Sequence, residues 1–390
     1  MTQTVQQASP TDKFSNWLEV DGGAFQGNVR SLLAMLDGRA LLCAVIKSDA
    51  YGHGADVVLP FLVACNVPYI GVGSNAEAGL ARAHGFTGKL LRVRAAAPQE
   101  VHAGLPFAIE ELVADPQSAR EMSMIAAAVG QKLQVHLDIN SSGISRHSLD
   151  VSSKVGMAQA TSIANDPHLG LAGIMTHFPC DDPGLIEHGL QRFRVESAAI
   201  LQSAGLPRSG ILLHAANSFS ALNVPSAWLD MVRAGAALYG DTDPGHSGFQ
   251  RCLTFKARVG SVNSYPAGSR VGYGLTYTLE APSVLATVTV GYGDGYRRAL
   301  GHRGPGHPPN HVLLRGRRAP IVDLISMNSM VVDVTDIQGV RPGDEVVLFG
   351  RQGDAEISAA QLEAANAGIL ADLYTVWATG ARVSKAAVGM

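Results

Sequence analysis

Residues 41–54 read LLCAVIKSDAYGHG. The first six are apolar, which is typical of a short strand buried on both faces of a parallel sheet. A lysine, Lys47, stands where this strand is expected to end, and a polar segment with two glycines follows it. Enzymes built on a barrel of parallel strands carry their reactive groups at the carboxyl ends of those strands. The position of Lys47 therefore predicts a reactive lysine, provided that the chain forms such a barrel.

Short apolar runs of this kind alternate with helical stretches from residue 40 to about residue 240. Stretches such as Asn75–His84 and Ser118–Val129 open on Asn, Asp or Ser, as helices do. Eight strand–helix units fit a closed (β/α)8 barrel better than an open doubly wound sheet, which usually has fewer strands and a glycine-rich first turn. The predicted strands are Leu41–Ile46, Tyr69–Val72, Leu90–Val93, Glu111–Val113, Leu133–Ile139, Leu171–Met175, Ile211–His214 and Met231–Leu238.

The composition changes after about residue 248, where Val- and Thr-rich segments are separated by Gly, Pro and Asp turns. This pattern predicts a second, mainly β domain, interrupted by a Pro- and Gly-rich loop at Gly301–Asn310. The predicted organisation is a flexible leader at 1–16, the barrel at 17–247 and the mainly β domain at 248–390. Strands are expected at Val284–Val290, Val312–Arg315, Met330–Val334 and Glu345–Phe349.

The overall composition excludes several classes of function. The chain has 390 residues, 46% of them hydrophobic, and its net charge of −3 is not gathered into blocks, so neither nucleic acid nor a membrane surface is an expected partner. No apolar run approaches the roughly 20 residues that cross a bilayer. The polar residues 1–16 predict a leader rather than a signal peptide, and so a cytoplasmic protein, or a periplasmic one if a signal was removed. The four cysteines lack CxxC spacing, so neither a metal site nor a disulfide framework is expected.

A lysine at the end of a buried strand can have its amine desolvated and its pKa lowered, which favours a Schiff base with a carbonyl cofactor. The alternative is a surface lysine whose stem lies along the barrel rim. The string KSDAYGHG resembles the pyridoxal-phosphate lysine motif of the alanine racemase family, with Lys47 as the cofactor lysine and Tyr51 four residues later. The resemblance extends from Asn16–Val20 to Asp344–Gly350 and is greatest to the broad-specificity amino-acid racemases.

Further strings resemble the cofactor site of that family. They are NSSGISR with Arg146, MTHFP with His177, HAANS with His214, Asn217 and Ser218, and MVRAG with Arg233 and Gly235.

The resemblance implies a role for each of these residues. Arg233 would face the pyridine nitrogen, where a guanidinium that stays protonated leaves the ring a weaker electron sink and suits simple removal and return of a proton. Its alternative is an ion pair at the barrel rim. Backbone N–H groups near Gly235 and Ala236, with the hydroxyls of Ser218 and Tyr51, would hold the phosphate. His177 would stack against the ring, although a strand-end histidine can also be a core group with satisfied hydrogen bonds.

Racemisation also needs a second base on the opposite face of the substrate. The resemblance implies Tyr273, in VGYGLTYT, contributed by the partner subunit of a homodimer with shared sites, and with His177 lowering the pKa of its phenol. Otherwise Tyr273 would simply pack between strands. Met327 and Asn328 in SMNSM and Arg146 would contact the substrate, and Tyr292 resembles the tyrosine at the entrance of the site.

The chain departs from the family pattern at several positions. Asp323-Leu324 stand where alanine-specific members have Gly-Arg, and Met327-Asn328 where they have Met-Asp. Asp138 replaces a lysine that is carbamylated in several members, and we expect its carboxylate to support Arg146 directly. His147-Ser148 replace the Asn-Gly of the broad-specificity branch. The stretch Leu373–Gly380 contains Tyr374 and Trp377 in place of the string that narrows the alanine-specific site.

These features predict a pyridoxal-phosphate-dependent racemase that interconverts L- and D-amino acids, with Lys47 and Tyr273 as the two bases and with alanine, lysine, arginine and similar substrates. One alternative is an alanine-specific racemase. A second is a fold-related decarboxylase, which would usually have a Glu at the Arg233 position. A third is a non-catalytic carrier of pyridoxal phosphate, but such proteins are single barrels without a β domain.

Overall fold

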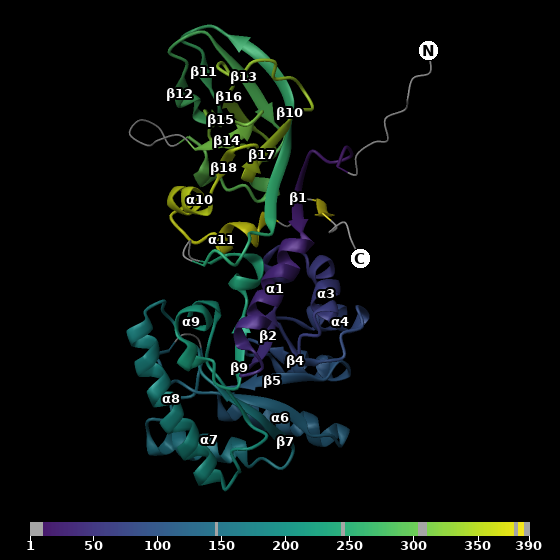
Figure 1. Cartoon of the computed structure of the whole chain (residues 1–390), viewed down its shortest axis with the longest axis vertical. Helices are drawn as coiled ribbons and strands as arrows, with labels where there is room; N and C mark the ends of the chain where they lie inside the picture. Colours follow the sequence, from purple (N-terminus) through teal and green to yellow (C-terminus); the bar gives the residue numbers. More distant parts are fainter. Residues whose placement is uncertain (1–10, 145–146, 243–245, 303–309, 378–380, 386–390) are drawn as a thin grey trace. The chain divides into compact units, whose positions relative to one another are not determined.

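The computed structural model describes residues 11–144, 147–242, 246–302, 310–377 and 381–385. By its internal contacts the chain divides into two compact units, shown as ribbons in Figure 1. The barrel unit comprises residues 24–50 and 58–251. The β unit comprises the residues up to 23, residues 51–57 and the residues from 252 onward.

The barrel unit contains one eight-stranded sheet in which every pair of adjacent strands is parallel, in the order β8-β7-β6-β5-β4-β3-β2-β9. The sheet closes between β8 and β9, where Asp230 donates its N–H to the carbonyl of Leu213 and Arg233 donates to that of Ala216. All eight predicted strands are confirmed. The last one ends at Ala234, four residues earlier than expected, because the chain then enters a 3₁₀ turn at Ala236–Tyr239. The strands are β2 Leu41–Val45, β3 Tyr69–Val72, β4 Lys89–Arg92, β5 Ile109–Val113, β6 Leu133–Asp138, β7 Leu169–Met175, β8 Leu212–His214 and β9 Met231–Ala234.

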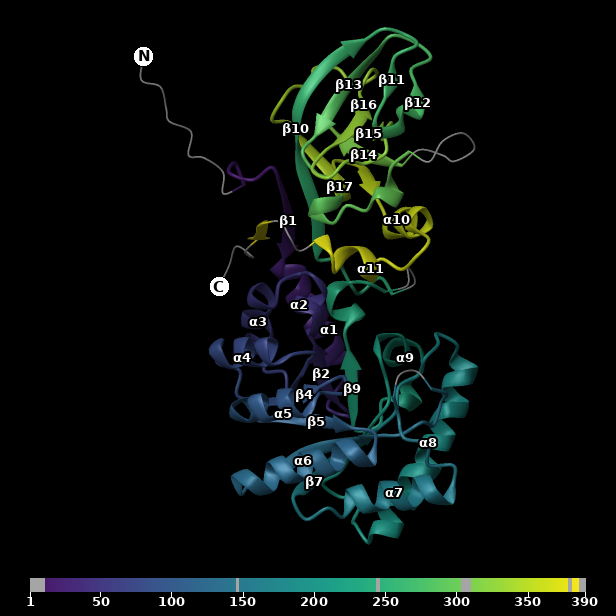
Figure 2. The same ribbon diagram turned by 180° about the vertical axis from the view of Figure 1, so that it is seen from behind.

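Helices follow the barrel strands, and the residues at their ends explain where they begin and stop. For example, Asp115 accepts two backbone N–H groups at the start of α6, and Gly130 ends that helix with a φ of 65°. Figure 2 shows α6, α7 and α8 outside the strands. The helices assigned in or leading into the barrel are α1 Gly22–Leu36, α2 Lys47–Tyr51, α3 Ala55–Ala64, α4 Asn75–Ala83, α5 Pro98–Gly104, α6 Pro116–Val129, α7 Lys154–Ala164, α8 Pro183–Ala204 and α9 Ser218–Asn223.

The β unit is built on a nine-stranded sheet with the order β15-β14-β17-β10-β1-β19, to which β13, β16 and β18 are also paired. The four strands predicted after residue 280 are present as β13, β14, β16 and β17, whereas most of the predicted loop at 301–310 lies outside the described residues. Two short helices, α10 Ala359–Asn366 and α11 Ala371–Tyr374, complete the unit. Its strands are β1 Asn16–Asp21, β10 Leu253–Tyr265, β11 Arg270–Val271, β12 Tyr277–Thr278, β13 Ser283–Val288, β14 His311–Leu314, β15 Arg317–Pro320, β16 Met330–Asp333, β17 Glu345–Gln352, β18 Ala355–Ile357 and β19 Ala381–Lys385.

The first strand of the chain differs from the predicted domain organisation. We expected residues from 17 onward to belong to the barrel, but β1 pairs antiparallel with β10 and parallel with β19. Its side chains Trp17, Leu18 and Val20 are buried. The N-terminal strand is therefore part of the sheet of the β unit, so this unit is assembled from both ends of the chain.

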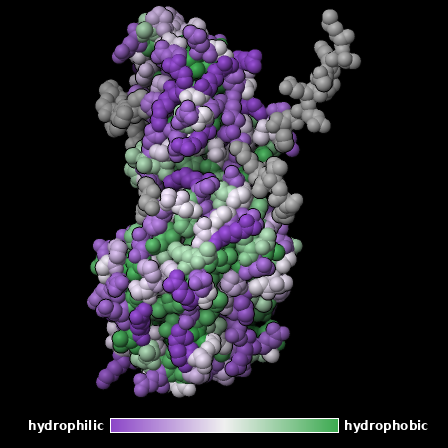
Figure 3. Space-filling view, in the orientation of Figure 1, coloured by the Kyte–Doolittle hydropathy of each residue, from purple (hydrophilic) through white to green (hydrophobic). Residues whose placement is uncertain are grey.

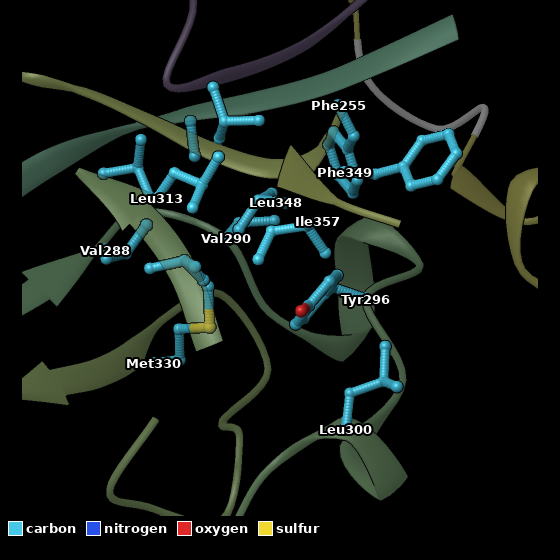
Figure 4. Close-up of a cluster of buried hydrophobic side chains, with 14 of the residues drawn as sticks. Phe255, Val288, Val290, Tyr296, Leu300, Leu313, Met330, Leu348, Phe349 and Ile357 are labelled. Carbon is cyan, nitrogen blue, oxygen red and sulfur yellow. The ribbon is translucent and has the colours of Figure 1, made fainter. Parts of the chain in front are cut away.

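The core of the β unit is a cluster of aliphatic and aromatic side chains, of which Figure 4 shows those around Phe255, Leu348 and Tyr296. Trp377 is fully buried and its ring lies 5.1 Å from that of Phe255 and 5.4 Å from that of Phe349. Tyr374 is buried in the same cluster. Residues 373–377 thus contribute two aromatic side chains, Tyr374 and Trp377, to the core.

The surface seen in Figure 3 mixes hydrophilic and hydrophobic side chains, and the hydrophilic ones dominate over the β unit. Within the described ranges, no helix combines the length and the apolar character that a membrane span requires.

Candidate active site

Lys47 begins a strained turn at the carboxyl end of β2. The next four residues, Ser48 to Tyr51, all have φ near +55°, a left-handed conformation that costs non-glycine residues roughly 1–2 kcal/mol each. The carboxylate of Glu77 stabilises this turn, because it accepts the N–H groups of Asp49 at 3.1 Å and of Gly73 at 2.6 Å. Glu77 also completes the capping box at the start of α4. The strained segment after Lys47 is thereby tied to the end of the next strand.

A glycine allows β3 to end close to the lysine. A Cβ atom at position 73 would lie 3.1 Å from Cβ of Lys47, tighter than ordinary contact. Lys47 itself is half-buried. The structure therefore places Lys47 where the sequence predicted it, at the carboxyl end of the first barrel strand and packed against backbone.

Arg233 lies on β9, directly opposite Cys43 of β2 in the strand register. Its guanidinium donates from Nη1 to Nδ1 of His214 at 2.7 Å and from Nη2 to the carbonyls of Thr176 and Ala215 at 2.9 and 3.1 Å. Arg233 is 7% exposed and His214 is fully buried. Burial, together with the charge of Arg233, lowers the pKa of His214 well below its ordinary value, so the imidazole is neutral. An arginine that is buried on β9 and donates to His214 and to the carbonyls of Thr176 and Ala215 differs from the ion pair at the barrel rim that was the alternative.

The hydroxyl of Ser218 is the centre of a small polar cradle. Its Oγ accepts the N–H of Gly235 at 3.0 Å and that of Ala237 at 3.1 Å. Asn217, the preceding residue, caps α9 by accepting the N–H of Ser220. We call Ser218, Gly235 and Ala237 the cradle. With both N–H groups donated to its oxygen, the hydroxyl of Ser218 still has its own proton to donate, and a hydroxyl held in this way suits a phosphate oxygen.

The sequence predicted phosphate-binding N–H groups near Gly235 and Ala236, and in the structure it is the N–H groups of Gly235 and Ala237 that reach Ser218. The difference follows from the 3₁₀ turn, which the apolar run at 231–238 concealed. The role of Ala236 stays a prediction.

Other predicted residues are placed around these groups. His177 is half-buried just after β7, and its carbonyl accepts the hydroxyl of Ser142 at 3.0 Å. Asp138, the last residue of β6, is buried, and its Oδ2 lies 3.5 Å from Nε2 of His147. Arg146 lies outside the described residues. Stacking by His177 and substrate contact by Arg146 stay predictions.

In the β unit, the structure brings together three of the predicted substrate residues. Tyr292 donates its N–H to the carbonyl of Ser326 at 3.0 Å, and Gly293 donates to that of Met327 at 2.8 Å. Tyr292 is 42% exposed, Met327 is 57% exposed and Asn328 is exposed. An open cavity of about 520 Å³ adjoins this turn and is lined by Tyr292, Gly295, Arg297, Arg298 and Val376.

Tyr273 presents its side chain to solvent and is 66% exposed. It begins a 3₁₀ turn after Gly272, whose φ of 74° requires glycine and whose backbone approaches Asp323 closely. Tyr51, also in the β unit, has its ring 6.3 Å from that of Tyr374. Contacts that would join Tyr273 or Tyr51 to the barrel residues stay predictions.

A row of polar side chains within the barrel strands was not predicted from the sequence. Glu110 on β5 and His136 on β6 are buried, and Nε2 of His136 lies 2.8 Å from Oε2 of Glu110. Nδ1 of His136 lies 2.8 Å from Nε2 of His214. The available signal was a charged or imidazole side chain within a strand of the barrel, in IEELV and LQVHLD.

A parallel eight-stranded barrel with a lysine, a buried arginine and the cradle at its carboxyl edge, followed by a β unit, defines a two-domain barrel enzyme. Two family models match the chain. The one described as alanine racemase, N-terminal domain, covers residues 20–243, and the one described as alanine racemase, C-terminal domain, covers residues 252–386. The chain belongs to the alanine racemase family. It is a racemase, and so an isomerase.

Relatives and solved structures agree with this assignment. The chain is 48% identical to the broad specificity amino-acid racemase of Pseudomonas taetrolens over 97% of its own length and 90% of the relative's. It is 40% identical to the lysine racemase of Proteus mirabilis, over 97% and 92%. The crystal structure of alanine racemase from a D-cycloserine-producing Streptomyces lavendulae superposes with a TM-score of 0.85 at 28% identity, over 98% of this chain and 99% of that one. The predicted barrel followed by a β domain is thus confirmed.

Proposed function

We propose that the chain is a pyridoxal-phosphate-dependent amino-acid racemase of broad specificity, with Lys47 and Tyr273 as the bases that exchange the Cα proton. The observation that carries the proposal is the placement of Lys47, Arg233 and the cradle at the carboxyl ends of β2, β8 and β9. These strands are neighbours where the barrel closes, so an amine, a fixed cation and a set of phosphate donors share one mouth of the barrel.

The residues present fit this cofactor. When bound, pyridoxal phosphate withdraws electrons from the Cα of an amino acid. Lys47 would hold it through an imine, and the cradle would hold its phosphate. Arg233 would donate to its pyridine nitrogen, since the guanidinium is buried, positively charged and held in place by His214 and two carbonyls. Because an arginine does not release its proton, the nitrogen stays an acceptor.

We further propose a homodimer in which each subunit supplies Tyr273 to the partner's barrel. Support comes from the surface of the β unit, where Tyr273, Leu275, Tyr292 and Met327 are all more than 40% exposed. Large apolar and aromatic side chains exposed together are typical of an interface. Tyr292, Met327 and Asn328 would then line the substrate pocket beside the Tyr273 phenol.

Broad specificity is supported by the relatives, of which one is named a broad specificity amino-acid racemase and another a lysine racemase. Asn328 also makes the pocket wall less anionic than the aspartate of alanine-specific members. Under the alternative, an alanine-specific racemase, only alanine and the smallest side chains would turn over. A carrier without activity would have no use for the exposed Tyr273 turn.

The test is to incubate the cofactor-loaded protein with each L-amino acid in D₂O and to follow deuterium at Cα and the chirality of the products. We expect exchange with inversion for alanine, lysine and arginine. Turnover of alanine alone would reject broad specificity. Exchange without inversion would keep Lys47 as a base and reject Tyr273 as its counterpart. If neither deuterium exchange nor inversion were observed, the two-base proposal would be rejected altogether.

A further inference from the structure

A continuous row of hydrogen-bonding side chains crosses the interior of the barrel. It starts at Lys89, the first residue of β4, whose ammonium lies 3.1 Å from Oε1 of Glu110. Glu110 contacts His136, His136 contacts His214, and His214 contacts Arg233, at 2.8, 2.8 and 2.7 Å. The row therefore links the amino-terminal edge of the barrel at Lys89 to the site at the carboxyl edge.

A glycine makes room for this row. His136 is on β6 and His214 on β8, so the strand between them, β7, must let the two rings meet. Gly173 of β7 is the register partner of His136, and a Cβ at position 173 would overlap Nδ1 of that ring. The two ring centroids lie 4.9 Å apart. Any larger residue at this point would separate the histidines.

The two charged ends fix every proton along the row. Arg233 has only donors, so Nδ1 of His214 must accept and its Nε2 must carry the proton. That proton is donated to Nδ1 of His136, which must therefore accept, leaving the proton of His136 on Nε2. This proton is donated to the Glu110 carboxylate, which has only acceptors when ionised. If His136 were doubly protonated, its Nδ1–H would face the Nε2–H of His214, and no hydrogen bond could form between them. Both rings are therefore neutral.

Glu110 has the properties that this arrangement requires. Both of its oxygens face donors: Oε1 lies 3.1 Å from the ammonium of Lys89, and Oε2 lies 2.8 Å from Nε2 of His136. The hydroxyl of Tyr69 donates to the same Oε2 at 3.1 Å. Glu110 is therefore ionised at neutral pH, and all the groups around it are donors.

We propose that Glu110 and His136 are positioning residues for the reaction: through His214 they fix the acceptor that holds Arg233 in place for the cofactor. The inference rests on the proposed function in one respect, that Arg233 contacts the cofactor. The hydrogen-bond direction itself is a property of the chain alone. If the row reversed, Nδ1–H of His214 would face Nη1 of Arg233, and the guanidinium would lose its anchor.

The main test is Glu110→Gln in the full-length protein. The substituted amide can turn its NH₂ toward His136 and its oxygen toward Lys89, and it then favours the reversed direction of the row, against the direction that Arg233 favours. The matched control is Glu111→Gln on the same strand, because Glu111 is equally buried but pairs with Arg92 outside this row. A second variant, Gly173→Ala, separates the two rings and adds no polar group, and its Cβ would also press on the carbonyl of Leu212.

The first readout is the tautomer of the histidines, measured by long-range ¹H–¹⁵N NMR on cofactor-free protein. We expect both His136 and His214 to carry their proton on Nε2 in the parent and in Glu111→Gln. In Glu110→Gln we expect the proton of His214 to move to Nδ1. If Glu110 had a purely structural role, or if it did not set the direction of the row, the proton of His214 would stay on Nε2 in Glu110→Gln.

The second readout is the dissociation constant of pyridoxal phosphate, from titration of its visible absorbance. We expect an increase of about tenfold in Glu110→Gln and Gly173→Ala, the size expected for one lost hydrogen bond to a charged group. Glu111→Gln should unfold more easily but bind within about twofold of the parent.

The possible failures can be told apart. A parent protein with His214 protonated on Nδ1, or a Glu110→Gln variant with unchanged tautomers and unchanged affinity, overturns the positioning role. The NMR result expected above, combined with the absence of racemisation in the parent, would reject the proposed function and leave the row intact. If the tautomers change but the affinity does not, Arg233 does not transmit the row to the cofactor, and the positioning role is rejected.

Discussion

Nη1 of Arg233 donates to Nδ1 of His214 at 2.7 Å inside a fully buried contact, and this one bond determines what kind of group position 233 can hold. The imidazole offers an acceptor because it is neutral, with burial and the arginine charge lowering its pKa. A donor is thus required at position 233. A carboxylate there would demand a proton on Nδ1 instead.

Arg233→Glu should therefore lower the racemisation rate by about 100-fold, which corresponds to roughly 3 kcal/mol in activation free energy. It should also raise the share of side products, because a carboxylate would accept a hydrogen bond from a protonated pyridine nitrogen and so stabilise the stronger electron sink. The measurement is chiral chromatography of the amino acid alongside quantification of keto-acid by-products. Arg192→Ala, which removes a surface pair with Glu196, should change neither. An unchanged ratio of racemisation to side reaction in Arg233→Glu would contradict the role given to Arg233.

Lys47→Ala should abolish covalent attachment of the cofactor. Borohydride reduction followed by peptide mass spectrometry should find the pyridoxyl group on the peptide that contains Lys47 in the parent, and on no peptide in the variant. Lys132→Ala, at an exposed lysine of the same unit, serves as the control and should keep the label. A label that survives in Lys47→Ala would show that another amine forms the imine.

The barrel could be predicted because each of its strands is a compact apolar run between turn residues, as in Leu41–Ile46 and Tyr69–Val72. The longest strand, β10, was not predicted, since Thr254, Lys256 and Arg258 interrupt its apolar residues and the face that carries them is only half-buried. The pairing of β1 with β10 and β19 joins segments more than 200 residues apart, and no local pattern contains that information.

The site residues that the sequence predicts differ from the others in where they lie along the strands. Lys47, Ser218 and Arg233 stand at strand ends, where their chemistry is visible in the sequence. The row from Glu110 to His214 depends on strand register, since it needs Gly173 to lie opposite His136. Ala237 joins the cradle only because the chain turns after Ala234.

Tyr273→Phe removes the phenol and keeps the ring, so the dimer surface should be preserved. We expect racemisation to fall by about 100-fold or more, a typical loss for a missing acid–base group. Exchange of the Cα proton of one enantiomer in D₂O should continue, because Lys47 is unaffected. Tyr265→Phe, which changes another exposed tyrosine of the β unit, is the control and should keep full activity. Equal loss of exchange for both enantiomers in Tyr273→Phe would argue against a separate second base.

Asp138→Ala tests whether a carboxylate has replaced the carbamate of related enzymes. Asp138 is buried at the end of β6, with His147 3.5 Å away, so removing it should release its neighbours and weaken substrate binding through Arg146. We expect the KM for alanine to rise about tenfold, the cost of one charged hydrogen bond. Activity of the parent should not respond to bicarbonate, since no lysine is carbamylated at this position. An unchanged KM in Asp138→Ala would reject the idea.

Asp323→Asn should make the protein more stable at neutral pH. Asp323 is 2% exposed and accepts one N–H, from Val331 at 3.1 Å, and burial raises its pKa from 3.8 to about 6. The native state therefore holds a proton between about pH 4 and pH 6 that the unfolded chain has released, so stability falls as the pH rises through this window. Above it, the buried charge costs up to about 3 kcal/mol, and an amide avoids that cost while it keeps an acceptor for Val331.

The measurement is the free energy of unfolding in urea at several pH values. The parent should lose stability between pH 4 and pH 6, and Asp323→Asn should not. Asp344→Asn is a control in which the pKa shift has the opposite sign. Burial raises the pKa of Asp344, but its hydrogen bonds with Arg315 and with the N–H of Arg341 lower the pKa overall. That variant should be less stable than the parent at pH 7, and the difference should disappear as the pH falls below the ordinary range of a carboxyl. Parallel curves for the parent and Asp323→Asn would show that Asp323 titrates as an ordinary exposed carboxyl.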